Sequence, residues 1–333
     1  MLNKGDDTMA KVLLTHGVPM ERFAGLKPHE LVHPAAGEAF TRAELITLLP
    51  ACQAVIACGA LDRELLQAAR HVALVVCYGA GYDSIDLAAA SEFGIPVANI
   101  PDSVTQATAQ LAMAQILALT RRVCELDHIL RASGSTRACF TMGASMGVLL
   151  EGMTLGIVGM GRIGARVAQF GRFLGMRVVY TSHSIKPLSI AGDARYLTLD
   201  ALMRTADVVS LHCPYTPQNK HMIGAAQLSL LKPTAYLINT ARGLLIDEQA
   251  LIDALEAGRL AGAALDVFET EPEVNARLKA LPNVVLTPHI GSNTLHTRNL
   301  MAEQCTALIR EAFAGIAPKH LLNPEVWGKH AMD

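Results

Sequence analysis

A glycine motif near the middle of the chain constrains its fold more than any other feature of the sequence. Gly159, Gly161 and Gly164 follow the apolar run at residues 155–158 and open a helix-length segment. In this strand–turn–helix context such a motif binds a dinucleotide: the first glycine permits the tight turn, the second lets the backbone approach a pyrophosphate, and the third lets the helix pack closely on the strand. The helix N-terminus offers free N–H groups to the phosphates. The predicted contacts are Gly159, Gly161, Arg162, Ile163 and Gly164.

The loop after the next predicted strand, residues 178–180, indicates which dinucleotide binds. An enzyme that uses NAD normally offers a carboxylate there to the ribose hydroxyls, but this chain has no acidic residue before Asp193. Hydroxyl, imidazole and ammonium groups stand there instead. They would donate hydrogen bonds to a 2′-phosphate, which a carboxylate would repel. The sequence therefore favours NADP(H), with NAD(H) left open. The predicted contacts in this loop are Ser182, His183 and Ser184.

Apolar runs of strand length alternate with helix-length segments along the chain, which predicts a doubly wound α/β architecture. The 333 residues exceed the size at which a single core usually stops growing, so we expect two domains. A long helix with an apolar stripe is expected at about residues 103–131, and shorter helices at 62–69 and 247–257. Strands are expected near residues 12–14, 55–57, 72–77, 97–100, 154–158, 178–180, 208–211, 236–238, 262–265 and 284–286.

Composition and charge exclude several classes of protein. Hydrophobic residues make up 51% and charged residues 17% of the chain, a globular balance with enough apolar residues for two cores. The formal net charge is −2 and no Lys/Arg cluster occurs, so we expect neither nucleic acid nor a membrane as a partner. No apolar run reaches membrane-spanning length, and residues 1–9 are too polar for the core of a signal peptide.

The seven cysteines indicate a reducing compartment. Their number is odd, no Cys-x-x-Cys spacing occurs, and several lie in apolar runs, so buried reduced thiols are expected. We therefore expect a soluble, cytoplasmic protein. No cluster of His, Cys and Asp shows the spacing of metal ligands, so no metal is expected.

Three segments in the second half of the chain place polar residues just past the carboxyl ends of predicted strands. Open α/β sheets bind their ligands at this edge. The segments contain Asn239-Thr240-Ala241-Arg242-Gly243, Glu271-Pro272 and Pro288-His289-Ile290-Gly291.

With the glycine motif, these segments resemble the D-isomer-specific 2-hydroxyacid dehydrogenase family, whose order and spacing of motifs they share. The resemblance covers nearly the whole chain, from the Gly-Ala-Gly segment at 79–81 to the Asn-Pro-Glu-Val segment at 323–326. It implies two doubly wound Rossmann-like domains with parallel sheets and an active site in the interdomain cleft. The substrate domain would be discontinuous, residues 1–101 plus 292–333, and the NAD(P)-binding domain would be residues 102–291. The resemblance also implies a homodimer, with the long predicted helix and the connection after it as the expected interface.

The resemblance assigns chemical roles that suit these residue types. Arg242 would bind the substrate carboxylate bidentately and polarise the 2-keto oxygen, a task suited to a planar, always-charged group. His289 would be the general acid in reduction and the general base in the reverse reaction. Glu271 would bond the far side of that imidazole and help it hold a proton near neutrality. The backbone amides of Ala80 and Gly81 would form a second clamp for the carboxylate.

Around the cofactor, the resemblance adds contacts from several strand ends. Asp266 would lie at the carboxamide end of the nicotinamide, and Thr108 would approach the cofactor from the long helix. The remaining implied contacts to the ring and ribose are His212, Cys213, Pro214, Thr240, Ala241 and His289.

The sequence as a whole predicts an NAD(P)H-dependent oxidoreductase that reduces a small 2-keto acid to the D-2-hydroxy acid. The segment 102–109 and the acid-free loop resemble glyoxylate/hydroxypyruvate reductases, so small unbranched keto acids are the first choice. Two alternatives stay open. One is an NAD(H)-dependent D-lactate-type or other D-2-hydroxyacid dehydrogenase, and the other is a cofactor-sensing binding protein on the same fold.

Overall fold

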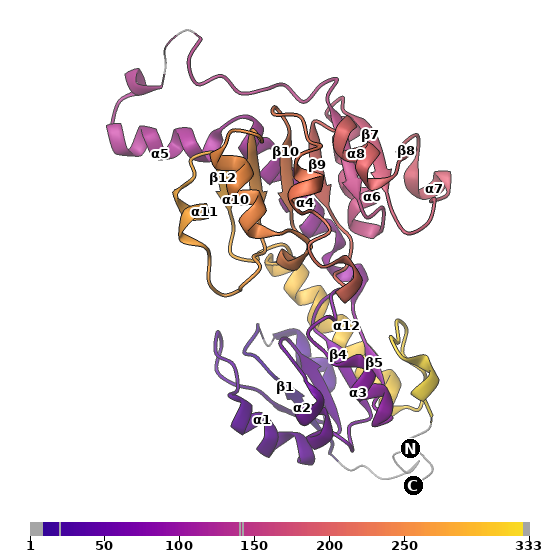
Figure 1. Cartoon of the computed structure of the whole chain (residues 1–333). Coiled ribbons are helices and arrows are strands. Elements are labelled where there is room, and N and C mark those ends of the chain that lie inside the picture. The colour runs from indigo at the N-terminus through magenta and orange to yellow at the C-terminus, as the bar shows by residue number, and fades with distance from the viewer. Residues whose placement is uncertain (1–8, 20, 140, 142, 329–333) are drawn as a thin grey trace. The chain divides into compact units, whose positions relative to one another are not determined.

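The computed structural model describes residues 9–19, 21–139, 141 and 143–328. The first eight residues, part of the stretch expected not to be a signal peptide, lie outside the described residues. The chain divides into two compact units, Met1–Val104 with Ser292–Asp333 and Thr105–Gly291. Each unit is built on its own parallel sheet (Figure 1).

The first unit has a five-stranded sheet in the order β2-β1-β3-β4-β5, and every neighbouring pair is parallel. Most of its strands are apolar throughout because both faces of the sheet are covered. The strands are β1 (Lys11–Leu14), β2 (Glu30–Val32), β3 (Ala54–Ala57), β4 (Leu74–Cys77) and β5 (Val97–Ala98). The α-helices are α1 (Arg42–Leu48), α2 (Arg63–Ala68), α3 (Leu87–Glu92) and α12 (Leu295–Phe313), and the 3-10 helices are η1 (Glu21–Leu26), η2 (Leu49–Ala51) and η6 (Pro324–Val326).

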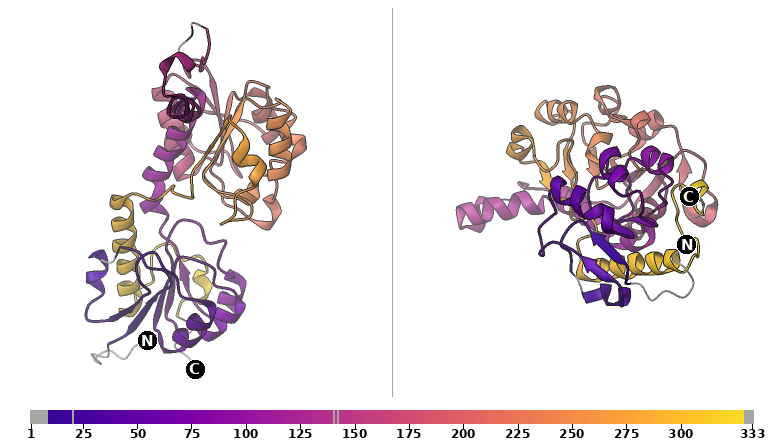
Figure 2. Two further views of the ribbon diagram at one scale, coloured as in Figure 1. Left: turned by 90° about the vertical axis from the view of Figure 1, so that its left-hand side faces the viewer. Right: turned by 90° about the horizontal axis from the view of Figure 1, so that it is seen from below.

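Helices cover both faces of this first sheet. On one face, Val12 and Leu14 of β1 share a core with Cys305 and Ile309 of α12. On the other face, Leu13 shares a core with residues of α1, α2 and α3. Figure 2 shows α12, in yellow, beside the indigo strands. Residues from both ends of the chain therefore build one core.

The second unit has a seven-stranded parallel sheet in the order β12-β11-β10-β9-β6-β7-β8. The strand order reverses between β6 and β9, and such a switch point is where open α/β sheets bind ligands. The strands are β6 (Thr154–Val158), β7 (Arg177–Thr181), β8 (Arg195–Tyr196), β9 (Val208–Leu211), β10 (Tyr236–Asn239), β11 (Gly262–Leu265) and β12 (Val284–Leu286). The helices are α4 (Pro101–Thr120), α5 (Val123–Ser133), η3 (Thr136–Ala138), α6 (Arg162–Phe173), α7 (Leu188–Ala191), α8 (Leu199–Thr205), η4 (Pro217–Asn219), α9 (Ala225–Leu228), η5 (Gly243–Leu245), α10 (Glu248–Glu256) and α11 (Ala276–Ala280).

Helices also cover both faces of the second sheet. Ile116 of α4 and Val167 of α6 share a core with one set of strand residues. Leu202 of α8 and Leu251 of α10 share a core with the other set. Helices therefore cover both faces of each sheet, and the predicted fold class of two parallel α/β domains is confirmed.

The single helix predicted at residues 103–131 is wrong. Two helices, α4 and α5, occupy this stretch, and between them Arg122 has a φ of 55°. The carbonyl of Thr120 accepts a hydrogen bond from the N–H of Val148 at 2.9 Å. A Cβ on Gly147 would lie 2.6 Å from that carbonyl oxygen, so the close approach needs glycine. The chain breaks its helix where a segment far along the sequence packs against it, and no local pattern shows this.

Local signals predicted several boundaries correctly. The side chain of Asp62 accepts from the N–H of Leu65 at 3.2 Å and caps α2, as expected from the sequence. Gly258, with a φ of 63°, follows the end of α10. The short strands β2 and β8 were not predicted, because each contains a charged residue and neither forms an apolar run.

All seven cysteines are unpaired thiols. Cys52, Cys77 and Cys305 are buried, but Cys124 is exposed on α5, so the expectation of buried thiols is wrong for that residue. Within the part of the chain that the structure describes, no helix is long and apolar enough to cross a membrane.

Candidate active site

Two of the three glycines of the motif, Gly159 and Gly164, occupy positions in the turn where a side chain would not fit. Gly159 has a φ of 100°, and a Cβ there would lie 2.5 Å from the backbone nitrogen of Cys213. A Cβ on Gly164 would lie 2.1 Å from the carbonyl oxygen of Gly159, so helix α6 packs directly on the turn. A Cβ on Gly161 would meet no atom within 4 Å, so that side of the turn is open. An open turn at the start of α6 fits the approach of a pyrophosphate.

Two neighbouring strand ends hold buried polar atoms that have no hydrogen-bond partner among the described residues. His212 follows β9, and its Nε2 lies 2.8 Å from Ser210 Oγ while its Nδ1 has no partner. Burial lowers the pKa of His212 to about 3, so its imidazole is neutral. Thr240 follows β10, and its Oγ1 also lacks a partner. Because buried polar atoms are nearly always bonded, these two fit contacts to polar groups of a bound nicotinamide cofactor.

The polar side chains of the acid-free loop after β7 carry only hydroxyl, imidazole and ammonium groups. Ser182 Oγ donates to the carbonyl of Ser184 at 2.6 Å, and Lys186 Nζ donates to Ser184 Oγ at 3.2 Å. His183 is exposed. Asp193, the first acidic residue after the strand, is paired with Arg172 of α6. The loop therefore offers donors and no free carboxylate to a ligand.

His289 and Glu271, which lie past the ends of β12 and β11, form a direct pair. His289 Nδ1 lies 2.8 Å from Glu271 Oε2. The backbone of His289 has a φ of 52°, and its N–H donates to the carbonyls of Asp266 at 2.9 Å and Thr287 at 3.0 Å. Strained backbone of this kind is found where function requires a particular side-chain placement. The two side chains are 52% and 36% exposed, so the imidazole is open to a ligand.

The carboxyl of Glu271 is held in its ionised form. Burial alone would raise its pKa, but hydrogen bonds from His289 and from the N–H of Phe268 at 2.9 Å act in the opposite direction. The charges of His289 and Arg242 add to this effect, and the net result is a lowered pKa. An ionised Glu271 accepts a hydrogen bond from the Nδ1–H group of His289, which leaves Nε2 free to act on a substrate.

Asp266 organises the loop that carries His289. It is 1% exposed, and its Oδ1 accepts from Thr287 Oγ1 at 2.6 Å and from the N–H of Ile290 at 2.8 Å. Its Oδ2 accepts from the N–H of Gly291 at 2.8 Å. Gln115 of α4 donates from Nε2 to Thr287 Oγ1 at 2.8 Å. Thr287 and Gln115 were not predicted from the sequence, although a polar residue inside the apolar stripe of a helix is a signal for such a contact.

Arg242 lies at the end of β10, and the side chain of Asn239 shapes its loop. Asn239 Nδ2 donates to the carbonyl of Arg242 at 2.8 Å, and Asn239 Oδ1 accepts from the N–H of Ala241 at 3.0 Å. Arg242 Nη1 donates to the carbonyl of Ala241 at 2.8 Å. Arg242, Glu271 and His289 follow the adjacent strands β10, β11 and β12 of the second sheet, and the charge of Arg242 contributes to the lowered pKa of Glu271.

The remaining predicted site residues lie in different places. Thr108 is buried in α4, and its Oγ1 donates to the carbonyl of Gly291 at 3.3 Å. Ala80 and Gly81 belong to the first unit and follow β4, where the carbonyl of Ala80 accepts from Asn99 Nδ2 at 2.7 Å. Their contact with a substrate stays a prediction.

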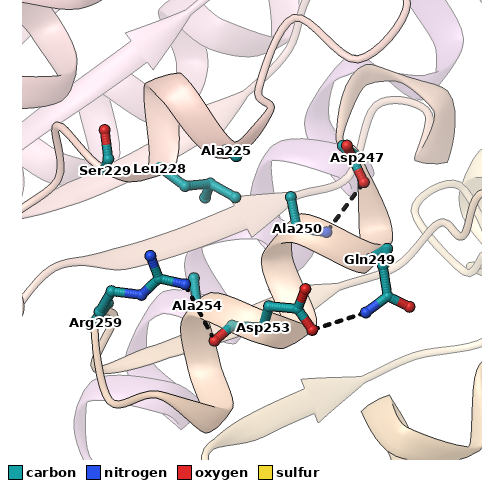
Figure 3. A pocket seen from close by; sticks show the side chains of 9 residues that line it. All are labelled: Ala225, Leu228, Ser229, Asp247, Gln249, Ala250, Asp253, Ala254 and Arg259. Atoms are coloured by element: carbon teal, nitrogen blue, oxygen red, sulfur yellow. Dashed lines mark hydrogen bonds between the residues drawn. The ribbon is translucent and has the colours of Figure 1, made fainter.

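A hollow between α9 and α10 contains none of the predicted site residues (Figure 3). Its polar side chains already have partners within the protein. Asp247 accepts from the N–H of Ala250 at 3.0 Å, and Gln249 Nε2 donates to Asp253 Oδ1 at 2.8 Å. Among the described residues, no group of three His, Cys, Asp or Glu side chains is placed to hold a metal ion.

Known proteins resemble this chain in sequence. Residues 113–291 match the model of the NAD binding domain of the D-isomer specific 2-hydroxyacid dehydrogenases. The chain is 43% identical over 269 residues to a glyoxylate reductase of Thermococcus litoralis, and the match covers 80% of this chain and 81% of that relative.

Solved structures resemble it in fold. A glyoxylate reductase from Paecilomyes thermophila has a TM-score of 0.86 and 30% identity, covering 95% of this chain and 99% of that one. An NADPH-dependent glyoxylate/hydroxypyruvate reductase from Sinorhizobium meliloti, solved with NADP and malonate, has a TM-score of 0.85 and 28% identity, covering 96% of this chain and 98% of that one. The resemblance seen in the sequence is thus confirmed, and the chain belongs to the D-isomer-specific 2-hydroxyacid dehydrogenase family of oxidoreductases.

Proposed function

We propose that this protein reduces a small 2-keto acid to the D-2-hydroxy acid. The observation that carries the proposal is the pair of His289 Nδ1 and Glu271 Oε2 at 2.8 Å, placed where the charge of Arg242 acts on Glu271. When bound, the reduced nicotinamide supplies the hydride that adds to C2 of the keto acid. The names of the similar glyoxylate reductases support glyoxylate and hydroxypyruvate as the first substrates to test.

The residues divide the work of the reaction. Arg242 binds the substrate carboxylate with its planar guanidinium and draws electron density from the keto oxygen. His289 delivers the proton from Nε2 to that oxygen, because Nδ1 is engaged with Glu271. Glu271 fixes the tautomer and stabilises the charged imidazole before transfer. In the reverse direction the neutral imidazole takes the proton from the hydroxyl group.

The first unit has a part in this proposal. The backbone N–H groups of Ala80 and Gly81 would bind the substrate carboxylate from the turn after β4. This role is a prediction from the sequence. Two further predictions are that residues 1–101 plus 292–333 form the substrate domain and that the active site lies in an interdomain cleft.

The proposed cofactor is NADP(H), with NAD(H) as the other outcome. Ser182, His183 and Ser184 would bind the 2′-phosphate in the loop that offers donors and no free carboxylate. The glycine turn would hold the pyrophosphate, and His212 and Thr240 would gain partners for their unbonded atoms. The remaining predicted contacts are Thr108, Arg162, Ile163, Cys213, Pro214, Ala241 and Asp266. We keep the prediction of a cytoplasmic enzyme that needs no metal.

The test is loss of the reduced-nicotinamide absorbance with NADPH or NADH against glyoxylate, hydroxypyruvate, pyruvate and a branched 2-keto acid. We expect turnover with NADPH and the small acids, and its loss in His289→Ala and Arg242→Ala. A preference for NADH and pyruvate would indicate the D-lactate-type alternative. Tight cofactor binding without turnover on any keto acid would favour the cofactor-sensing protein.

A further inference from the structure

A second histidine–glutamate pair lies beside the candidate active site, and the proposed reaction does not use it. His221 follows η4, and its Nε2 lies 2.7 Å from Glu269 Oε1. The two side chains are 34% and 25% exposed. His221 has a φ of 52°, a left-handed conformation that is uncommon for residues other than glycine. The surroundings therefore hold this histidine in place against the preference of its backbone.

Glu248, at the start of α10, extends the pair to a cluster of three residues. The N–H of Glu248 donates to Glu269 Oε2 at 3.2 Å, and the N–H of Glu269 donates to Glu248 Oε2 at 3.3 Å. Glu248 is only 8% exposed, and burial raises the pKa of its carboxyl. Each glutamate thus binds the backbone of the other, and His221 offers a donor to Glu269, whose carboxylate would otherwise repel that of Glu248.

This cluster joins loops that leave three adjacent strands. Glu269 lies between Phe268 and Glu271 on the loop after β11, and Glu248 lies on the connection that follows Arg242 after β10. His221 lies on the segment after β9, and its N–H donates to the carbonyl of Leu244 at 2.9 Å. The loops that carry Arg242 and Glu271 are therefore bonded to each other through residues that need not touch the substrate.

The loop that carries Arg242 also packs directly against the loop that carries Glu271. A Cβ on Gly243, next to Arg242, would lie 2.0 Å from the carbonyl carbon and oxygen of Phe268. The N–H of Phe268 in turn donates to Glu271. A shift of the Phe268–Glu269 backbone would therefore displace both Arg242 and Glu271.

We propose that His221, Glu248 and Glu269 are positioning residues that hold Arg242 and Glu271 at the spacing that the reaction needs. The proposal rests on the proposed function. Arg242 must meet the carboxylate of the keto acid while Glu271 keeps His289 oriented for proton transfer, and both groups lie on loops past strand ends. A misplacement of about 1 Å can lower a rate roughly 100-fold, so a fixed spacing has a large effect on turnover.

Two substitutions of His221 test the proposal. His221→Leu removes the donor to Glu269, whereas His221→Gln keeps an N–H donor in the side chain. We expect His221→Leu to lower kcat/KM for glyoxylate by roughly 10- to 100-fold, with a higher KM because Arg242 is displaced. The pH profile of kcat/KM should change as well, because a displaced Glu271 no longer orients the imidazole of His289. His221→Gln should restore most of the activity and the wild-type profile.

Two further variants complete the experiment. Gln249→Leu changes an exposed residue next to Glu248 on α10 (Figure 3) and should leave KM and the pH profile unchanged. If His221→Leu does not fold, Glu269→Gln carries the same expectation, because it keeps the size of the side chain and removes its charge. NADPH affinity should fall by much less than kcat/KM in the folded variants, since the glycine turn that would bind the pyrophosphate lies on another loop.

Several outcomes would overturn the proposal. They are a wild-type KM and pH profile in His221→Leu, no recovery in His221→Gln, or a loss of NADPH affinity as large as the loss of activity. If the wild-type protein turns over no keto acid, the proposed function fails instead. The cluster is then tested separately by the crystal structure of His221→Leu. The separation of Arg242 and Glu271 should differ there from that in wild type, and an unchanged separation would contradict the positioning role.

Discussion

At the scale of single residues, the pair of His289 and Glu271 couples the charge of one side chain to the protonation of the other. The lowered pKa of Glu271 means that its carboxylate stays ionised as the pH falls through the usual range of glutamate, about pH 4.3. The carboxylate therefore continues to stabilise a proton on His289 under mildly acidic conditions. Its contribution to folding stability is present above that range and disappears as the pH falls through the lowered pKa.

Replacing Glu271 by glutamine tests this coupling. The amide keeps the size of the side chain but loses its charge, so we expect kcat/KM for keto-acid reduction to fall roughly 100-fold or more. The pH profile of kcat/KM should change, because the charge that acts on His289 is gone. The loss of thermal stability relative to wild type should be present at neutral pH and vanish in acid. Glu273→Gln, an exposed neighbour, is the matched control, and an unshifted profile in Glu271→Gln would contradict the coupling.

The unbonded hydroxyl of Thr240 provides a test of cofactor contact. Thr240→Val removes only that group, and the cofactor-free protein should keep its Tm because no hydrogen bond within the protein is lost. A lost contact to NADPH of about 1 kcal/mol should raise the Kd roughly 5-fold, measured by fluorescence titration. Thr306→Val removes an equally unbonded hydroxyl in α12 and should leave the Kd unchanged. Equal Kd values in the two variants would remove Thr240 from the cofactor site.

The chemical groups of the site could be predicted from the sequence, but the bonds that hold them could not. Arg242, Glu271 and His289 stand in motifs that resemble those of a known family, so their residue types and their order in the chain were sufficient to predict their roles. Gln115 and Thr287 are joined by a hydrogen bond across 172 positions of the sequence. A polar residue in an apolar helix face signals that Gln115 has a buried partner, but which residue that partner is depends on the tertiary fold.

At the scale of elements, apolar runs predicted the central strands because parallel strands covered on both faces carry few polar residues. The strands β6, β9, β11 and β12 begin and end at the expected residues. The break between α4 and α5 could not be predicted, since it depends on the contact of Thr120 with Gly147 and Val148. The periodicity of apolar residues shows which face of a helix or strand is buried. It does not show which other element packs against that face.

The close approach of the loops after β10 and β11 leads to a prediction at this scale. Gly243→Ala places a methyl group about where the carbonyl of Phe268 lies, so one loop must move. We expect kcat/KM to fall roughly 100-fold, measured with glyoxylate and NADPH, together with a lower Tm. Gly224→Ala is the control, because its Cβ would meet its nearest atom at 3.4 Å, an ordinary contact. Unchanged turnover in Gly243→Ala would show that the spacing of the loops does not limit the reaction.

At the scale of the whole molecule, hydropathy alone could not show that residues from both ends of the chain form one unit. The contact of α12 with β1 joins residues nearly a whole chain apart, and only the resemblance to a known family predicted a discontinuous domain. The same resemblance predicts a homodimer. The structure supports this proposal through α5, a helix with no buried residue that exposes Val123 and Leu130.

The dimer is tested by charging this surface. Val123 and Leu130 are 55% and 43% exposed, and Met146 and Leu149 in the following connection are each 71% exposed. Apolar side chains on an element without a core of its own indicate a surface that another chain covers. We expect Val123→Glu with Leu130→Glu to convert a wild-type dimer to monomers in analytical ultracentrifugation.

The control for this experiment separates an interface from a general effect of charge. Phe173 ends α6 and is 89% exposed, more than any of the four residues above. Phe173→Glu should therefore leave the dimer intact, because exposure of a single side chain does not make an interface of the size that stable dimers bury, at least about 1,200 Å². A dimer that survives the α5 substitutions but not Phe173→Glu would place the interface on α6, and a monomeric wild type would remove the homodimer proposal altogether.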